Sequence, residues 1–147
     1  MKKWNLKKTF TITVIVVAGL AFIISACTTK VMSRKDFVAE CKPTIKLITV
    51  NEARTLYDSG EWIFLDVRME KEFKKGAIPK AIHLERGLLE FMIWKKIPDK
   101  TKKIVVYCKT GGRSSLAVCT IKKMGYVNAV SMEGGWKGWM NEGHPVA

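Results

Sequence analysis

Apolar positions in this chain gather in short runs that are separated by polar and turn-forming segments. The runs of strand length are 45–48, 63–66, 81–84, 104–108 and 129–132. Segments of helical or turn character lie between them. This repeated alternation of strand and helix predicts an α/β fold, a small parallel β-sheet of about five strands with helices on both faces.

Three of the intervening segments carry helix signals. Thr49 and Glu52 have the spacing of a capping box, which predicts a helix that runs to Tyr57. Further helices are predicted over 88–95 and 114–124, because a proline or a glycine follows each of them. About a hundred residues, from 45 to 147, are enough for one compact core of this kind.

The first thirty residues follow a different pattern. Four lysines, at positions 2, 3, 7 and 8, precede an uncharged and mostly apolar run of 21 residues, 9–29. The small residues Ser25 and Ala26 stand before Cys27 in that run. A basic start, an apolar middle and small residues before a cleavage site are typical of a secretory signal, which we place at residues 1–26.

The end of this signal resembles the lipobox of bacterial lipoproteins, in the sequence Ile24-Ser25-Ala26-Cys27. The resemblance implies that Cys27 receives a diacylglyceryl group, that the preceding peptide is removed and that the new amino terminus is acylated. Several acyl chains anchor a protein stably where one does not. An uncleaved transmembrane helix is the alternative, since 21 uncharged residues can cross a bilayer.

Both alternatives place the remaining chain in the cell envelope, at the periplasmic or extracellular face of a bacterial membrane. Residues 27–44 are then the lipidated cysteine and a tether, because they mix small, polar and charged residues without a period. Pro43 also disfavours a helical conformation at Lys42. The folded domain is predicted over 45–147.

The net positive charge of the chain suggests a nucleic-acid-binding protein until the positions of the charged residues are considered. The 147 residues include 26 basic and 13 acidic side chains, a formal net charge of +13. Without the four signal lysines, 22 basic residues remain against 13 acidic ones, or +9. We expect no nucleic acid as a partner of an exported chain, and we expect the charge to favour anionic lipid headgroups and small anions.

The candidate chemistry follows the fourth predicted strand. Cys108 ends the strand. The loop after it and the start of the next helix consist of Lys109, Thr110, Gly111, Gly112, Arg113 and Ser114. Ligands of parallel sheets bind at the carboxyl ends of strands. The glycines allow successive amides to point inward as an anion-binding nest, and a helix start and nearby cations favour a thiolate. We predict a cysteine nucleophile in an anion-binding loop.

This segment resembles the active-site loop of the rhodanese family of sulfurtransferases, and further motifs extend the resemblance from residue 45 to the C-terminus. They are Leu65-Asp66-Val67-Arg68 with Glu72-Phe73, then Gly76-Ala77-Ile78-Pro79-Lys80-Ala81-Ile82, and Gly125-Tyr126 with Gly134-Gly135-Trp136 and Trp139. The chain departs from the family pattern at Ala77, where a histidine is usual, at Lys80, where a glycine is usual, and at Lys109, where an arginine is usual. The last departure keeps the charge but loses a bidentate donor.

The resemblance implies a rhodanese-like three-layer fold and a double displacement. Cys108 takes sulfur from a small anionic donor such as thiosulfate, forms a persulfide, and passes the sulfur to cyanide or a thiol. We expect Lys109 to Ser114 to bind the substrate, and Asp66, Arg68 and Glu72 to support the loop through ion pairs and hydrogen bonds. No cofactor is implied, and no cluster of His and Cys has the spacing of a zinc site.

Other functions remain open at this point. Phosphatases that share the fold have a loop one residue longer between cysteine and arginine, so the four residues here favour sulfur. A persulfide carrier that serves a protein partner, and a redox thiol domain without sulfur transfer, are further alternatives. In an oxidising compartment, Cys41 or Cys119 could also act as a resolving thiol for Cys108.

Overall fold

The computed structural model describes residues 31–147, so the predicted signal, the lipobox and Cys27 lie outside the described residues. The five strands are β1 (Lys46–Ile48), β2 (Ile63–Asp66), β3 (Ile82–His83), β4 (Ile104–Tyr107) and β5 (Ala129–Met132). They form one sheet in the order β1-β5-β4-β2-β3, and every neighbouring pair is parallel. The predicted α/β fold with a five-stranded parallel sheet is therefore confirmed.

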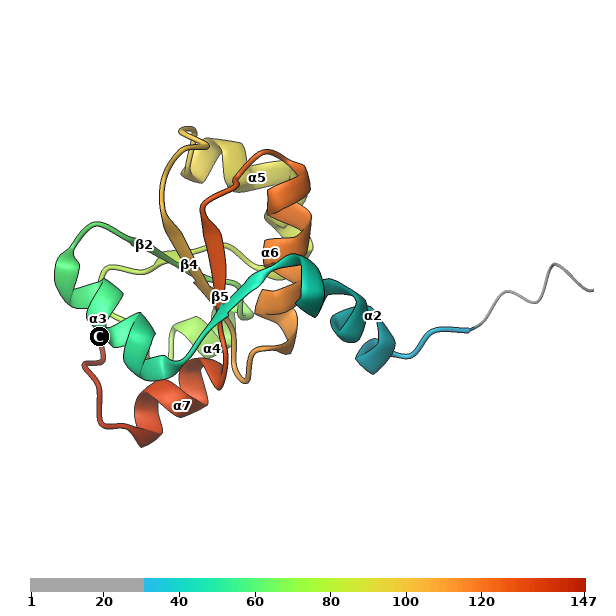
Figure 1. Ribbon diagram of the computed structural model, residues 1–147. Helices are drawn as coiled ribbons and strands as arrows, with labels where there is room; N and C mark the ends of the chain where they lie inside the picture. The colour runs from blue at the N-terminus through green and yellow to red at the C-terminus, as the bar shows by residue number, and fades with distance from the viewer. Residues whose placement is uncertain (1–30) are drawn as a thin grey trace, which may run out of the picture. The chain divides into compact units, whose positions relative to one another are not determined.

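Helices cover both faces of the sheet, which gives three layers (Figure 1). The α-helices are α2 (Arg34–Cys41), α3 (Val50–Ser59), α4 (Glu70–Phe73), α5 (Leu89–Lys96), α6 (Gly112–Lys123) and α7 (Gly135–Asn141), and the 3₁₀ helices are η1 (Lys42–Thr44) and η2 (Arg86–Leu88). Helices α5 and α6 contribute to one apolar core, and α3 and α7 to the other. None of the helices in residues 31–147 is long and apolar enough to cross a membrane.

Strand β4 is the centre of this arrangement, and all four of its residues are buried. Ile104 and Val106 pack into the core under α5 and α6, while Val105 and Tyr107 pack into the core under α3 and α7. This alternation follows from the two-residue period of a strand. Because β4 is held from both faces, the residue that follows it, Cys108, starts from a rigid position.

The predicted capping box of α3 is present in the structure. Thr49 Oγ1 accepts a hydrogen bond of 3.2 Å from the amide of Glu52, whose carboxylate accepts one of 2.7 Å from the amide of Thr49. Gly60 ends the helix with a φ of 70°, a conformation that favours glycine. Helices α5 and α6 are present as well, each within two residues of its predicted bounds.

Residues 34–44 differ from the irregular tether that we expected over 27–44. They form α2 and η1, and Ser33 and Asp36 make a capping box at the start of α2. None of the residues of α2 is buried, so the helix leaves no apolar period in the sequence. The expectation that Pro43 keeps Lys42 out of a helical conformation is wrong. Lys42 has φ −53° and ψ −44°, and its amide donates a hydrogen bond to the carbonyl of Val38, which continues the turn of α2 into η1.

A disulfide joins Cys41 at the end of α2 to Cys119 in α6. This pairing contradicts the hypothesis that either cysteine resolves Cys108, which is the free cysteine of the described residues. The sequence could not show the pair, because 78 positions separate the two cysteines. Helix α2 therefore belongs with the domain and packs against α6.

Candidate active site

Cys108 lies where β4 ends and the loop to α6 begins, and its side chain is buried with 1% exposure. The amide of Gly111 donates a hydrogen bond of 3.2 Å to the Cys108 sulfur. Gly111 can direct its amide inward because its φ is 101°, a conformation that other residues rarely adopt. A backbone donor aimed at the sulfur stabilises negative charge on it.

Serine side chains fix the far end of the loop. Ser114 and Ser115 each donate a hydroxyl hydrogen bond of 2.9 Å to the carbonyl of Gly111. Ser131 on β5 donates one of 3.0 Å to the Ser114 hydroxyl. Ser114, which we predicted to bind substrate, is thus buried and holds the loop to the sheet.

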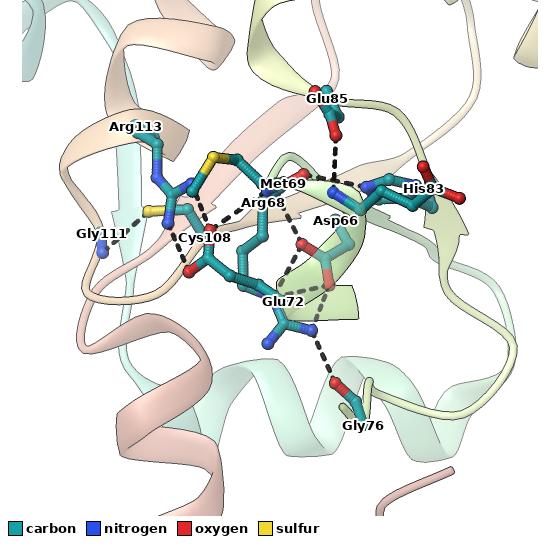
Figure 2. Close-up of polar contacts among 11 residues, drawn as sticks. Asp66, Arg68, Met69, Glu72, Gly76, His83, Glu85, Cys108, Gly111 and Arg113 are labelled. Carbon is teal, nitrogen blue, oxygen red and sulfur yellow. Dashed lines mark hydrogen bonds and ion pairs between the residues drawn. The ribbon is translucent and has the colours of Figure 1, made fainter. Parts of the chain in front are cut away.

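Arg113 stands beside the cysteine but is already paired. Its two terminal nitrogens donate to the two carboxylate oxygens of Glu72, at 2.7 and 2.9 Å, and Figure 2 shows this pair next to the Cys108 sulfur. These bonds lower the pKa of Glu72 to about 2, against the opposing effect of its partial burial. The same bonds, and to a smaller extent Cys108, raise the pKa of Arg113. Arg113 therefore stays charged while its bidentate face is occupied.

A second ion pair, between Asp66 and Arg68, lies buried beneath the site (Figure 2). Arg68 Nη2 donates to Asp66 Oδ2 at 2.6 Å and to the carbonyl of Gly76 at 2.8 Å. Its guanidinium also lies over the ring of Trp136, 4.6 Å from the centroid. Removal of one partner of such a buried pair costs about 3–5 kcal/mol, because the other charge is left uncompensated.

The first turn of α7 closes on the cysteine loop. The amide of Trp136 donates 2.7 Å to the carbonyl of Cys108, and the amide of Lys137 donates 3.1 Å to that of Lys109. Gly135 makes this approach possible, since a Cβ there would collide with the Cys108 carbonyl and lie 2.9 Å from the Thr110 amide. Gly135 is therefore a requirement of the site.

A cavity of about 800 Å³ opens over Cys108, and we call it the Cys108 pocket. Its lining from the loop and α6 is Cys108, Lys109, Thr110, Gly112, Arg113 and Leu116, and its lining from α2 and η1 is Arg34, Lys35, Val38, Ala39 and Lys42. Lys109, Thr110 and Arg113 thus face the space where we expected substrate. The residues from α2 were missed, because we interpreted their segment as a tether.

Metal-binding side chains do not gather in the part of the chain that the structure describes, where no group of three or more His, Cys, Asp or Glu residues could hold an ion. A nucleophile with an amide donor, a fixed cation and an open pocket suits attack on a small electrophilic atom. The fold and the site together define a class of protein, an α/β domain with a buried free cysteine at the carboxyl end of its central strand.

Comparisons with known proteins agree with this class. The family model described as the rhodanese-like domain matches residues 49–142. A sulfurtransferase of Allochromatium vinosum is 30% identical over 94 residues, which cover 64% of this chain and 86% of that protein. The chain belongs to the rhodanese-like domain family.

Two solved structures resemble the whole domain. The polysulfide-sulfur transferase homodimer of Wolinella succinogenes matches with a TM-score of 0.64 and 31% identity, over 75% of this chain and 83% of that one. A Rhodopseudomonas palustris protein of unknown function, described as a possible tyrosine phosphatase, matches with a TM-score of 0.75 and 32% identity, over 82% of this chain and 98% of that one. The single-domain rhodanese fold predicted from the motifs is confirmed.

The first prediction concerns the pH dependence of the Glu72–Arg113 pair. The pKa of Glu72 is about 2 in the folded chain against 4.5 ordinarily, so its stabilising effect is complete above about pH 4.5 and disappears as the pH falls towards about 2. Glu72→Gln removes this titration. We expect the wild type to exceed the variant in free energy of unfolding at about pH 6, and the gap to narrow at about pH 2. Urea unfolding at both pH values measures this gap, and a constant gap would contradict the prediction.

Gly135 and Gly60 both have a positive φ, but only Gly135 lies against the cysteine loop. Gly135 and Gly60 have φ values of 55° and 70°, so alanine pays a similar conformational cost at each, roughly 1–2 kcal/mol. A Cβ at Gly60 has no atom within 4 Å, whereas one at Gly135 collides with the cysteine loop. We expect Gly135→Ala to lower the free energy of unfolding more than Gly60→Ala and to change the alkylation rate of Cys108. Equal effects of the two variants would disprove the proposed contact.

Proposed function

We propose that the chain is a sulfurtransferase that moves sulfane sulfur from thiosulfate or a similar anionic donor to a thiophilic acceptor through a persulfide on Cys108. The observation that carries this proposal is the buried Cys108 sulfur, which accepts a hydrogen bond from the amide of Gly111 beside the charged Arg113. The sulfurtransferases among its relatives support the same chemistry.

The first half of the reaction loads the cysteine. The Cys108 thiolate attacks the outer sulfur of the donor, a new S–S bond forms, and the S–S bond of thiosulfate breaks so that sulfite leaves with the electron pair. Lys109, which is exposed and lines the pocket, attracts the dianionic donor. The Gly111 amide, aimed at the Cys108 sulfur, stabilises the negative charge that develops there.

The second half unloads the cysteine. Cyanide or a thiolate attacks the outer sulfur of the persulfide, and the bond to Cys108 breaks to regenerate the thiolate. Arg113 remains beside the sulfur throughout, because Glu72 holds its guanidinium through both terminal nitrogens. The charge of Arg113 therefore acts through space on the sulfur while Glu72 occupies its bidentate face.

The occupied arginine also separates sulfur transfer from phosphoryl transfer. A phosphate dianion binds best to a free bidentate guanidinium, and Glu72 already takes both donors of Arg113. A single sulfur atom needs only the cysteine and a nearby donor. This favours sulfur chemistry for this chain, although one structural relative is described as a possible tyrosine phosphatase.

We further propose that the chain works in the cell envelope and is lipid-anchored through Cys27. The lipobox-like sequence before Cys27 supports this location. The Cys41–Cys119 disulfide supports it independently, since disulfides persist in exported proteins and are rare in the cytosol of mesophiles.

The test of activity is thiocyanate formation from thiosulfate and cyanide by the purified chain. We expect Cys108→Ser to abolish turnover and wild-type Cys108 to gain the mass of one sulfur atom after exposure to the donor alone. A stable persulfide with little turnover would instead favour a sulfur carrier, and no adduct would favour a redox thiol domain. Hydrolysis of an aryl phosphate that depends on Cys108 would favour phosphoryl transfer.

The test of the anchor is expression of the full chain in a bacterium, with mass spectrometry of the membrane fraction. We expect an amino-terminal peptide that begins at Cys27 and carries acyl groups. Cys27→Ser should leave the peptide before position 27 uncleaved and without acyl groups. An unmodified Cys27 within an intact segment 1–30, in the wild type, would instead identify an uncleaved transmembrane anchor.

A further inference from the structure

Two walls form the Cys108 pocket, and only one of them belongs to the cysteine loop. The second wall is α2 with η1, which places Arg34, Lys35 and Val38 at the cavity over Cys108. Helix α2 packs against α6, and a Cβ built at Gly112, the first residue of α6, would lie 4.0 Å from the side chain of Val38. The family model matches 49–142, so this wall lies outside the matched region.

The charge of the pocket comes in large part from this second wall. Every ionisable lining residue besides Cys108 is a cation, and among them Arg113 pairs with Glu72 and Lys42 with Glu133. Arg34, Lys35 and Lys109 make no ion pair within residues 31–147. Three cations that are not neutralised by a neighbour can attract and hold an anion here.

The pocket also has an apolar part and more room than thiosulfate fills. Val38, Ala39 and Leu116 also line it, and its volume of about 800 Å³ falls in the range of pockets for organic ligands. A small inorganic dianion can use the charge but not the apolar surface. An organic anion with sulfane sulfur can use both.

The placement of this wall depends on a covalent link. Helix α2 has eight residues and buries none of them, and a helix so short is marginal in water without packing. It packs against α6, and its covalent and ionic attachments are at its C-terminal end, where Cys41 is bonded to Cys119 and the following Lys42 pairs with Glu133 at 3.1 Å. The disulfide therefore holds Arg34 and Lys35 at the pocket.

We propose that α2 is the donor-binding wall of this sulfurtransferase, that Arg34 and Lys35 bind the anionic group of the donor, and that the preferred donor is an organic anion with sulfane sulfur, such as a thiosulfonate. The proposal rests on the proposed function of Cys108 and adds its substrate class. The apolar body of the donor lies against Val38 and Leu116, and the Cys41–Cys119 disulfide keeps the wall in place.

The experiment compares two donors, thiosulfate and benzenethiosulfonate, with cyanide as the common acceptor and the full chain as the enzyme. We expect wild-type kcat/KM to be higher for benzenethiosulfonate. The double variant Arg34→Gln, Lys35→Gln should lower kcat/KM about tenfold for both donors, which corresponds to about 1.4 kcal/mol, and leave kcat at saturating donor unchanged. Val38→Asn should lower kcat/KM for benzenethiosulfonate alone.

The matched control removes two charges elsewhere. Lys75 and Lys96 are exposed lysines that do not line the Cys108 pocket, so the variant Lys75→Gln, Lys96→Gln should keep wild-type kcat/KM for both donors. Equal losses in the control and in the Arg34, Lys35 variant would overturn the proposal, as would a wild-type preference for thiosulfate. Absence of thiocyanate from wild type with both donors would overturn the proposed function itself.

A further arm tests the disulfide. The variant Cys41→Ser, Cys119→Ser frees α2 without adding a thiol, and we expect it to match the Arg34, Lys35 variant in kcat/KM while it keeps wild-type kcat. Thermal unfolding reports whether this variant is folded at the assay temperature. A folded variant whose kcat/KM equals that of the wild type would overturn the role of the disulfide. If the variant is unfolded, the substitutions of the exposed Arg34 and Lys35 decide the proposal.

Discussion

The buried ion pair between Asp66 and Arg68 is the interaction on which the rest of the site depends. Arg68 is 2% exposed, and it reaches from the end of β2 to the carbonyl of Gly76 and the face of Trp136. The amide of Trp136 in turn bonds to the carbonyl of Cys108. One guanidinium therefore connects the second strand, the turn before the third strand and the first turn of α7 to the nucleophile. A buried charge without its partner is costly, so the Asp66–Arg68 pair holds these segments in one arrangement.

The site separates two tasks of positive charge. Arg68 and Arg113 are both held by carboxylates, so they fix geometry and a constant local field. Arg34, Lys35 and Lys109 line the pocket without such partners within the described residues, and they remain available to an incoming anion. A loop that must hold a reactive sulfur in place benefits from this division. A cation that no carboxylate holds would turn away from the sulfur into solvent.

The sequence alone predicted the features that local patterns encode. The apolar runs located the strands, the capping box located α3, and the position of Cys108 after a buried strand located the site. It could not predict features that depend on distant pairs. The sequence indicated that Glu72 supports the loop but not that its partner is Arg113, 41 positions away, and the partner of Cys41 lies 78 positions away. Helix α2 was missed for a related reason, since a helix that buries no side chain carries no apolar period.

The disulfide has one more consequence, for the fate of the chain after proteolytic damage. It closes a covalent ring that contains every residue from Cys41 to Cys119, including β1 to β4 and Cys108. A single cut in an exposed turn of this ring, such as the segment after α5, leaves both pieces attached to one another. The nicked molecule keeps its central strand and its nucleophile at an effective concentration that separate fragments could not reach. In a compartment that contains proteases, such a domain can survive a first cleavage.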